Sequence, residues 1–477
     1  MSEANDDIEA RTCPSGLDRR EFLAAGAGIA AALAAPGLRR AAYARGTPGR
    51  GAALNLIFCV SDGMSSGTLT MADMMIRAQT GKSSRWLEFQ GRSGTRRAML
   101  NTSSADSLVT DSAAASATWG IGEPVNNESI GMTPDGRLLS PILLRAKEAG
   151  KATGLVTTTR LSHATPAGFI ACVPTGRDDE AAIAEQILER GVDVMLGGGA
   201  HYLTDALLAK HTGVHVVRTR EELAGSAAGP RDSQRLLGLF AEQHMSYEIE
   251  RPDSEPTLAE MTRVALARLS RAPGGFAVQI EGGRVDHAAH SNDAASMLRD
   301  QVAFDEAIGV AIDFASARDD TLVILTTDHG NANPGLTEYG IKGNKGFERL
   351  AGCRRSFDWV IREVKAAGGV VDGERLRAIV RESSGVTLED HEVAMVLRAF
   401  SGEAVDPYLT AGRSTGPLGS VLANHFGVAF LSPNHTSDYV ELLAAGPGSE
   451  GLPAYLRHRD VHRLMIEALD LPEARVM

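Results

Sequence analysis

The sequence has few cysteines, no excess of basic residues and no long apolar run. The opposite features would mark a disulfide-rich protein, a nucleic-acid binder and a membrane-spanning protein. It has 4 cysteines in 477 residues. With Cys13 in an N-terminal leader three would remain, and an odd number makes a poor disulfide framework. The formal net charge of −12 argues against a general nucleic-acid binder, which usually carries a basic patch. It does not argue against anionic substrates, because bound metal can invert the charge of a site.

No stretch of the chain is apolar enough for a transmembrane helix, which needs about 20 residues. The leader holds an apolar run, Phe22–Ala35, of 14 residues. It follows two arginines at 19 and 20 and precedes Ala-Tyr-Ala at 42–44, an A-x-A-like cleavage site. This order predicts a signal peptide over residues 1–44, export of residues 45–477 by the twin-arginine machinery, and a periplasmic or secreted protein. An ordinary buried or surface helix is the alternative.

The rest of the chain reads as a globular α/β protein. At 43% hydrophobic and 23% charged the composition is ordinary. Short β-branched runs alternate with helical stretches, and most runs are apolar on both faces, as in a parallel sheet covered by helices. The pattern predicts a doubly wound, mostly parallel central sheet with helices on both faces. The predicted strands are Leu54–Val60, Thr153–Thr159, Val192–Leu196, Phe276–Glu281 and Thr321–Thr327.

Two stretches break this alternation. Residues of about 343–410 are helical and charged and lack strand-like runs, which predicts a helical insertion above the sheet. The polar stretch Thr204–Pro256 is interpreted as a second insertion. Ligands of doubly wound sheets bind at the carboxyl ends of the strands, so we expect the functional site there.

Acids and histidines follow strand-like runs at four places in the chain. Asp286 and His290 are four residues apart, so on a helix they face the same way. A carboxylate with an imidazole is a common way to hold zinc. Each group alone is more often structural, but four such strand ends together predict two or more divalent ions. The residues concerned are Asp62, Glu281, Asp286, His290, Asp328, His329 and His435.

A candidate nucleophile opens the alanine-rich stretch at 112–118. Asp111 can cap the helix that these residues form, which places Ser112 in its first turn. Free backbone N–H groups and the helix dipole favour anions there. A serine in this place is often only a cap, and its hydroxyl has too high a pKa to attack unaided. A metal ion on its oxygen would remove that difficulty, so the serine and the acids point to one mechanism.

Six motifs occur together and in one order over roughly residues 54–447. They are Ser-Asp62-Gly-Met, Thr-Asp111-Ser112-Ala-Ala, His163-Ala-Thr165-Pro-Ala, Glu281-Gly-Gly-Arg-Val-Asp286-His-Ala-Ala-His290, Thr-Asp328-His329-Gly-Asn and Asn-His435-Thr. With this combination the chain resembles the alkaline phosphatases, secreted metal-dependent phosphomonoesterases. The resemblance implies an alkaline-phosphatase-like fold with a helical cap, a homodimer, and hydrolysis of small phosphate monoesters to alcohol and phosphate through a phosphoserine intermediate.

The resemblance also implies two zinc ions, one magnesium ion and a role for each residue. The first zinc, which activates water and holds the leaving oxygen, would be bound by Asp286, His290 and His435. The second zinc, which holds the nucleophile Ser112 as an alkoxide, would be bound by Asp62, Asp328 and His329. Magnesium would be bound by Asp62, Thr165 and Glu281. The implied phosphate clamp is Arg177, a planar fork suited to two phosphate oxygens.

Two features depart from the family pattern. His163 stands where some members have aspartate, and imidazole suits zinc or cobalt better than magnesium. His163, with His287 near it, therefore leaves the third ion open between Mg²⁺, Zn²⁺ and Co²⁺. Arg177 is one residue further from the His-Ala-Thr-Pro motif than the pattern predicts, so we expect a one-residue bulge at 174–176. Asp178 or Arg160 is the alternative clamp residue.

Other functions stay open at this point. A phosphodiesterase or a sulfatase on the same fold is the nearest alternative. Cys172-Val-Pro174-Thr-Gly-Arg177 comes close to the sulfatase motif Cys-x-Pro-x-Arg, but it is one residue too long. A diester lacks one charged oxygen, so an arginine clamp and a third ion favour monoesters. A non-catalytic phosphate- or metal-binding protein is the remaining alternative, but it would not need Ser112 beside both zinc sites.

Overall fold

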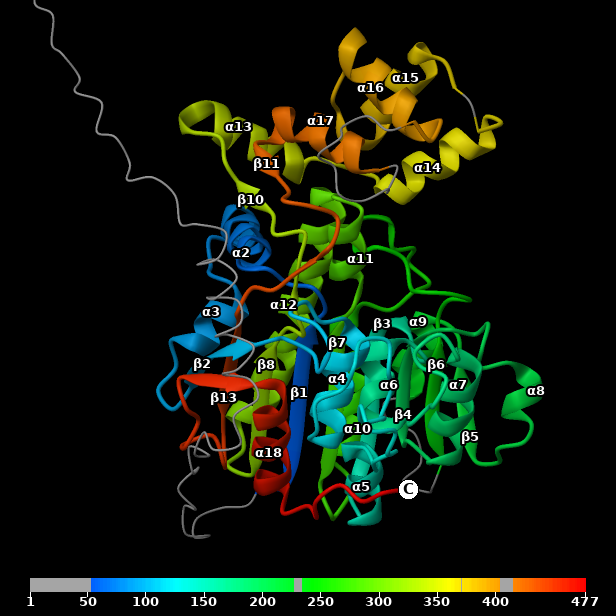
Figure 1. Cartoon of the computed structure of the whole chain (residues 1–477), viewed down its shortest axis with the longest axis vertical. Coiled ribbons are helices and arrows are strands. Elements are labelled where there is room, and N and C mark those ends of the chain that lie inside the picture. The colour runs from blue at the N-terminus through cyan, green and yellow to red at the C-terminus, as the bar shows by residue number, and fades with distance from the viewer. Residues whose placement is uncertain (1–52, 227–233, 370, 404–414) are drawn as a thin grey trace, which may run out of the picture. The chain divides into compact units, whose positions relative to one another are not determined.

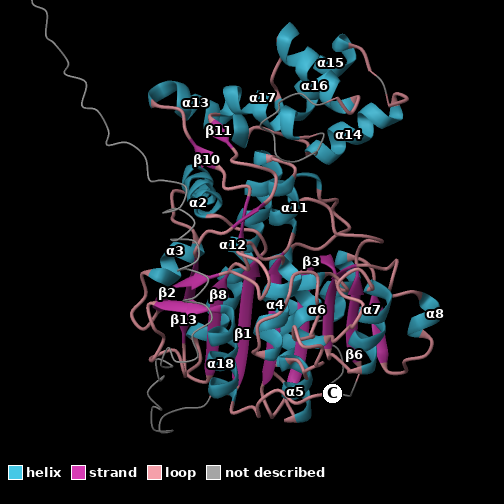
Figure 2. Cartoon of the chain, viewed as in Figure 1, coloured by secondary structure: helices cyan, strands magenta, loops and turns pink. Residues whose placement is uncertain are grey.

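The described residues build a large mixed sheet with helices on both faces (Figures 1 and 2). The computed structural model describes residues 53–226, 234–369, 371–403 and 415–477, and the predicted leader lies outside these ranges. The sheet has ten strands in the order β14-β2-β13-β8-β1-β7-β3-β4-β6-β5. They are β1 (Asn55–Ser61), β2 (Arg96–Asn101), β3 (Ala152–Arg160), β4 (Val194–Gly198), β5 (Val214–Val217), β6 (Arg235–Leu239), β7 (Phe276–Gly282), β8 (Thr321–Thr326), β13 (Val440–Ala445) and β14 (Tyr455–Arg457).

Helices connect and cover these strands. None of those in the described ranges is long and apolar enough to cross a membrane. Those outside the segment 340–426 are α2 (Ser66–Thr80), α3 (Arg85–Gln90), α4 (Ser112–Ile121), α5 (Ile142–Glu148), α6 (Ala164–Ile170), α7 (Glu180–Glu189), α8 (Asp205–Leu208), α9 (Arg220–Ser226), the short 3₁₀ helix η1 (Glu248–Glu250), α10 (Leu258–Leu269), α11 (Arg284–His290), α12 (Ala294–Ser316) and α18 (His458–Leu469).

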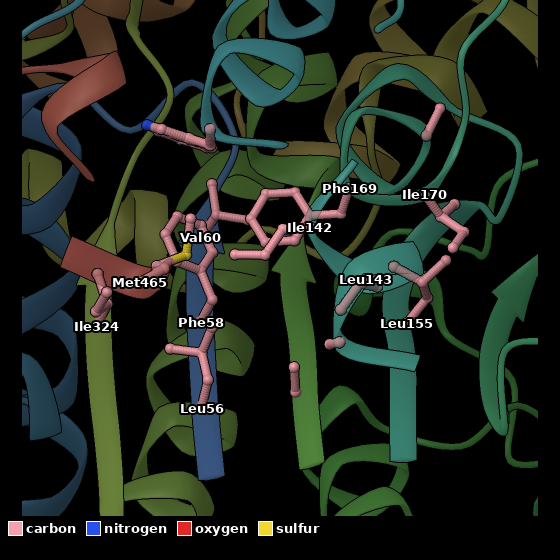
Figure 3. Close-up of a cluster of buried hydrophobic side chains, with 14 of the residues drawn as sticks. Leu56, Phe58, Val60, Ile142, Leu143, Leu155, Phe169, Ile170, Ile324 and Met465 are labelled. Atoms are coloured by element: carbon pink, nitrogen blue, oxygen red, sulfur yellow. The ribbon is translucent and has the colours of Figure 1, made fainter. Parts of the chain in front are cut away.

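Strand β1 lies at the centre of the sheet and is buried on both faces. Phe58 points to one face, where its ring lies 5.0 Å from the rings of Trp119 on α4 and Phe169 on α6 (Figure 3). Ile57 and Cys59 point to the other face and belong to a core built with α10 and α12. This alternation within an all-apolar run is what a parallel sheet covered on both sides requires, and it confirms the predicted α/β fold.

The sheet is parallel except for β13, which pairs antiparallel with both β8 and β2. The five predicted strands correspond to β1, β3, β4, β7 and β8. Strands β2, β13 and β14, which form one flank of the sheet, are not among the predicted strands. The strand-like run that precedes His435 in the sequence, residues 428–431, forms only β11 (Val428–Ala429), which pairs with β10 (Gly335–Leu336) outside the main sheet.

The interpretation of Thr204–Pro256 as an insertion above the sheet is wrong. Within that stretch β5 and β6 extend the main sheet beyond β4, because β6 pairs parallel with both β4 and β5. The strand β6 reads Arg-Leu-Leu-Gly-Leu and four of its five residues are buried. This short run is surrounded by polar residues, so the stretch as a whole has a polar composition although it contains a buried strand.

The segment 340–426 is helical wherever it is described and stands beyond the carboxyl ends of the central strands (Figure 1). Its apolar side chains pack with those of α11 and α12 in a third core, in which Val360, Leu376 and Val396 are fully buried. The insertion is thereby attached to the helices that follow β7. Its helices are α13 (Gly340–Ala351), α14 (Phe357–Ala366), α15 (Gly373–Ser384), α16 (Asp390–Phe400) and α17 (Gly416–Phe426).

Candidate active site

The central strands carry their acids to one edge of the sheet. Strand β1 is parallel to both neighbours, with Val60 opposite Glu281 of β7 and opposite Thr326 of β8. Asp62 is two residues beyond Val60, and Asp328 is two residues beyond Thr326. Both acids therefore lie beside Glu281. All three acids are fully buried. A buried acid is stable only with compensating partners, so the residues around these three decide what the site can do.

The turn after β1 depends on a glycine. Gly63 has φ +70°, and a Cβ there would lie 2.6 Å from Oδ1 of Asp286. Only glycine therefore permits the approach of this turn to α11. The N–H of Gly63 donates to Oδ1 of Asp328 at 3.0 Å, and the side-chain amide of Asn331 donates to Oδ1 of Asp286 at 2.6 Å. These bonds hold the acids in place.

Asp286, His290 and His435 form a first group of possible ligands. Nδ1 of His290 lies 2.7 Å from the carbonyl of Pro433, and Nδ1 of His435 lies 2.8 Å from that of Thr110. A carbonyl only accepts, so in neutral rings both Nε2 atoms carry lone pairs. These atoms are 3.0 Å apart, and each lies 3.4 Å from a carboxylate oxygen of Asp286. The two Nε2 atoms and the carboxylate thus face one another as acceptors, and a backbone carbonyl orients each ring. This arrangement fits a bound cation.

Asp62, Asp328 and His329 form a second group, which lies against Ser112. Nε2 of His329 is 3.3 Å from Oδ2 of Asp328 and 3.7 Å from Oδ1 of Asp62. Oγ of Ser112 is 3.2 Å from Nε2 of His329 and 3.5 Å from Oδ1 of Asp62. Ser112 is the first residue of α4, and the N-cap Asp111 accepts from a backbone N–H of its first turn. The local sequence thus produces the predicted helix start, with its serine facing the acids.

Asp62, His163 and Glu281 form a third group. Oγ1 of Thr165 lies 3.4 Å from Oδ2 of Asp62, and the hydroxyl of Thr157 donates to Oε2 of Glu281. In contrast, Oε1 of Glu281 and Nδ1 of His163 are buried without a hydrogen-bond partner. Oδ2 of Asp328 also lacks a hydrogen-bond partner. Buried polar atoms usually have a partner, so these atoms also fit bound cations.

The electrostatics of the acids agree with this arrangement. Burial, with repulsion from neighbouring carboxylates, raises the pKa of Asp62 well above its usual value. Burial also raises the pKa of Glu281 to about 7 and that of Asp328 to about 6. Acids so close together resist ionisation unless a positive charge lies among them. Divalent cations supply that charge, so the donor atoms and the charge both fit metal binding.

Arg177 lies at the start of α4. Its Nη1 donates to Oδ2 of Asp111 at 2.9 Å, and its Nη2 lies 3.4 Å from Nε2 of His163. Gly176 has φ +87°, and its Cβ would lie 2.7 Å from the carbonyl oxygen of Glu128. That carbonyl also accepts from the N–H of Arg177 at 2.8 Å. A tight glycine turn therefore precedes Arg177, at the place where the sequence has its extra residue.

The two alternative clamp residues are placed differently. Arg160 forms a bidentate pair with the carboxylate of Glu180 and also donates to Nε2 of His244 at 2.7 Å. Its charge is thus neutralised within the fold. Asp178 is exposed. Arg177 is the one of the three that lies directly against Asp111 at the N-terminus of α4.

The alkaline phosphatase family model matches residues 53–471. The chain belongs to the alkaline phosphatase family. Alkaline phosphatase 3 of Bacillus subtilis is 30% identical over 372 residues, which are 76% of this chain and 77% of that protein. The crystal structure of Thermus thermophilus alkaline phosphatase has a TM-score of 0.82 at 34% identity, over 92% of this chain and 98% of that chain.

A third solved structure shares the fold at lower identity. A mutant alkaline phosphatase of the Antarctic bacterium TAB5, with Mg bound in its M3 site, shares the fold at 21% identity. Its TM-score is 0.64, over 88% of this chain and 99% of that chain. The family membership and the fold implied by the motifs are thus confirmed. As an alkaline phosphatase the protein is a phosphoric monoester hydrolase, and its three ligand groups are candidate metal sites consistent with that family.

Several residues of this alkaline phosphatase site had no signal in the sequence. His244, on the loop after β6, places its ring 5.4 Å from that of His163 and 4.4 Å from that of His287. Asn331 holds Asp286, and Arg284 contacts His287. Their roles come from contacts between distant segments. Arg284 and Asn331 are part of the quoted motifs but had no predicted role, and nothing in the sequence indicates His244.

Proposed function

We propose that this alkaline phosphatase works through a phosphoserine intermediate on Ser112. The observation that supports this best is the position of Oγ at the start of α4, 3.2 Å from His329 and 3.5 Å from Asp62. Oγ would attack phosphorus in line, the bond from phosphorus to the alcohol oxygen would break, and the phosphoryl group would stay on Oγ. Water would then attack phosphorus and release phosphate, which restores the hydroxyl.

Arg177 and α4 would hold the phosphoryl group during both steps. The guanidinium donates from a planar fork, and its contact with Asp111 fixes its orientation. Asp111 at the same time caps α4, whose first N–H groups point to the place where an anion would lie. One carboxylate thus orients both elements that would bind the charged oxygens. Donors that are already in position before the reaction stabilise charge as it develops.

We assign zinc to the first two ligand groups and a third divalent ion to the group of Asp62, His163, Thr165 and Glu281. The first two groups combine imidazole nitrogens with carboxylate oxygens, which suits zinc. When bound, such ions lower the pKa of the oxygens they hold and neutralise charge on the phosphate and leaving oxygens. The Mg in the M3 site of TAB5 is reported for mutants in which a histidine is changed to aspartate or glutamate, so it leaves magnesium open for the third ion of this chain. His163 favours zinc or cobalt there.

Phosphate monoesters should be turned over at least about 10²-fold faster than the matching diester, because a diester lacks one charged oxygen for Arg177 and the third ion to bind. Purified enzyme can be assayed on the monoester, the diester and the sulfate ester of one alcohol. Arg177→Ala should lower both the monoester rate and the ratio of monoester to diester rates. Faster turnover of the diester or the sulfate ester would contradict the proposed preference.

We also propose export by the twin-arginine machinery, because an arginine pair, an apolar run and a cleavage site follow one another in residues 1–44. Changing Arg19 and Arg20 together to lysine should leave the folded enzyme active inside the cell. Fractionation would measure phosphatase activity outside the cytoplasm, with a variant in which only Arg11 is changed to lysine as the matched control. Undiminished export of the double variant would contradict a twin-arginine export signal in these residues. A homodimer stays a prediction from the family.

A further inference from the structure

The helical insertion reaches the metal-binding groups through one arginine. Arg284 is the first residue of α11, and its guanidinium carbon lies 3.7 Å from the centre of the ring of Tyr247. Its Nη2 lies 3.5 Å from Oδ2 of Asp358, in the first turn of α14 of the insertion. Arg284 is only 9% exposed. A buried cation needs fixed partners, and here one partner belongs to the insertion.

The first turn of α14 is itself fixed to the body of the protein. The N–H of Phe357 donates to Oδ2 of Asp293, the N-cap of α12, at 2.7 Å. The N–H and the hydroxyl of Ser356 both donate to Oε1 of Glu250, at 2.6 and 2.8 Å. These bonds to buried or half-buried carboxylates set the place of α14, and with it the place of Asp358 beside Arg284.

On its other side Arg284 determines the hydrogen-bonding state of His287. Its Nη1 lies 2.8 Å from Nδ1 of His287. A guanidinium only donates and keeps its protons in proteins, so Nδ1 must accept, and a neutral His287 must carry its proton on Nε2. The ring lies edge-on to that of His163, with centres 5.5 Å apart. Neither nitrogen of His287 then offers a lone pair to an ion, since Arg284 occupies one and a proton the other.

We propose that Arg284, supported by Asp358 of the insertion and by Tyr247, is a positioning residue that holds His287 as an Nε2–H donor beside the third metal-binding group. This differs from the sequence-based expectation, in which His287 favoured zinc or cobalt in that group. The donor suits an anionic oxygen of the substrate. The insertion thereby strengthens substrate binding without contributing a ligand. The effect on activity rests on the proposed ligand roles of His163 and Glu281, whereas the state of His287 does not.

Nitrogen NMR of histidine-labelled protein tests the state of His287 directly, with the signal assigned by its loss in His287→Gln. We expect the Nε2–H form in wild-type protein both with and without zinc and magnesium. In Arg284→Gln the signal should shift toward a mixture of the two neutral forms. A proton on Nδ1 in wild type, or a zinc-dependent shift typical of a metal-bound nitrogen, would overturn the proposal.

Kinetics test the link to the insertion. Asp358→Asn should raise KM for a phosphate monoester up to about fivefold with little change in kcat, because its pair with Arg284 is half-exposed. Arg284→Gln should raise KM by about tenfold or more, and Arg284→Lys should do so less. Metal content by elemental analysis should stay at the wild-type value in all three.

Glu363→Gln is the matched control, because Glu363 lies on the same helix α14 but pairs with Arg375 within the insertion. It should leave KM unchanged. An equal effect of Asp358→Asn and Glu363→Gln, or loss of the third ion in Asp358→Asn, would contradict the link. If Arg284→Gln does not fold, the KM of Asp358→Asn still tests the link, because Asp358 is half-exposed and its replacement should not disturb folding. Failure of the phosphoserine proposal would appear in Ser112 variants and would leave the His287 signal as expected here.

Discussion

Replacing Ser112 by alanine is expected to lower kcat/KM for a phosphate monoester by about 10³-fold or more, while the protein keeps its metal ions. Oγ of Ser112 is the atom that would carry the phosphoryl group, and no ligand group in the described structure requires it. Its loss should therefore remove the chemistry and leave the acids in place. Steady-state kinetics measure the loss, and elemental analysis with a melting curve shows whether the ions and the fold remain.

Ser107→Ala provides the matched control. Ser107 lies five residues before Ser112 in the same segment, and its Oγ accepts from the N–H of Val109 at 3.1 Å, away from the acids. Its activity should stay within about threefold of wild type. Mass spectrometry of enzyme quenched during turnover should find a phosphoryl group on Ser112 of wild type. Full activity of Ser112→Ala, or a phosphoryl group on another side chain, would contradict the assignment.

Removing the metal ions should abolish activity and lower the melting temperature by about 10–20 °C. Without ions, Asp62, Glu281 and Asp328 repel one another in a buried place, and Nε2 of His290 faces Nε2 of His435 at 3.0 Å. Calorimetry before and after dialysis against a chelator measures the loss, and adding back zinc with magnesium should restore both properties. An unchanged melting temperature would mean that these groups do not bind structural ions.

In the metal-free protein, Glu281 and Asp328 should contribute stability that is lost as the pH rises from about 4 to 7. The pKa of Glu281 is raised from 4.5 to about 7, and that of Asp328 from 3.8 to about 6. In that interval these two carboxyl groups bind more protons in the folded state than in the unfolded state, so their contribution favours unfolding as the pH rises. Their stabilisation is complete below the unfolded pKa values and is lost as the pH passes the folded ones. Buried histidines outside the ligand groups, such as His458 and His462 with pKa values lowered to about 3, contribute the opposite slope to both the metal-free and the ion-loaded form.

In the ion-loaded enzyme these carboxylates should contribute the opposite trend, because protons compete with the ions for them. Asp293 and Asp305 are also buried with pKa values of about 6. They contribute the same slope to both forms, so the difference between the two melting curves belongs to the metal-binding groups. Parallel pH profiles of the two forms would contradict this account.

The central part of the fold could be predicted because its strands are recognised from residues that are neighbours in the sequence. A strand buried on both faces must be apolar throughout, and the acid and glycine after β1 mark where it ends. Since parallel neighbours end at the same edge, Asp62, Glu281 and Asp328 could be expected together before any contact was known. The helix start at Ser112 was predictable for the same reason, because a cap needs only its own neighbours.

The parts that could not be predicted depend on contacts between distant segments. Strand β6 is a run of five residues in a polar stretch, and only its pairing with β4 shows that it belongs to the sheet. The contacts of Arg284 with Asp358 and of His244 with His287 join separate elements through side chains that follow no period. The sequence therefore indicated the candidate ligands of the site better than the residues that orient them.

The pairing of His435 with the rest of the site has a consequence for how the enzyme matures. The last ligand enters through β12 (His435–Thr436), which pairs with β9 (Gly330–Asn331), and Nδ1 of His435 bonds to Thr110, 325 residues earlier. Contacts over such separations form late in folding. The first ion site thus stays incomplete until most of the chain has been synthesised and folded. We therefore expect tight uptake of the first ion only once the chain has folded with His435 in place.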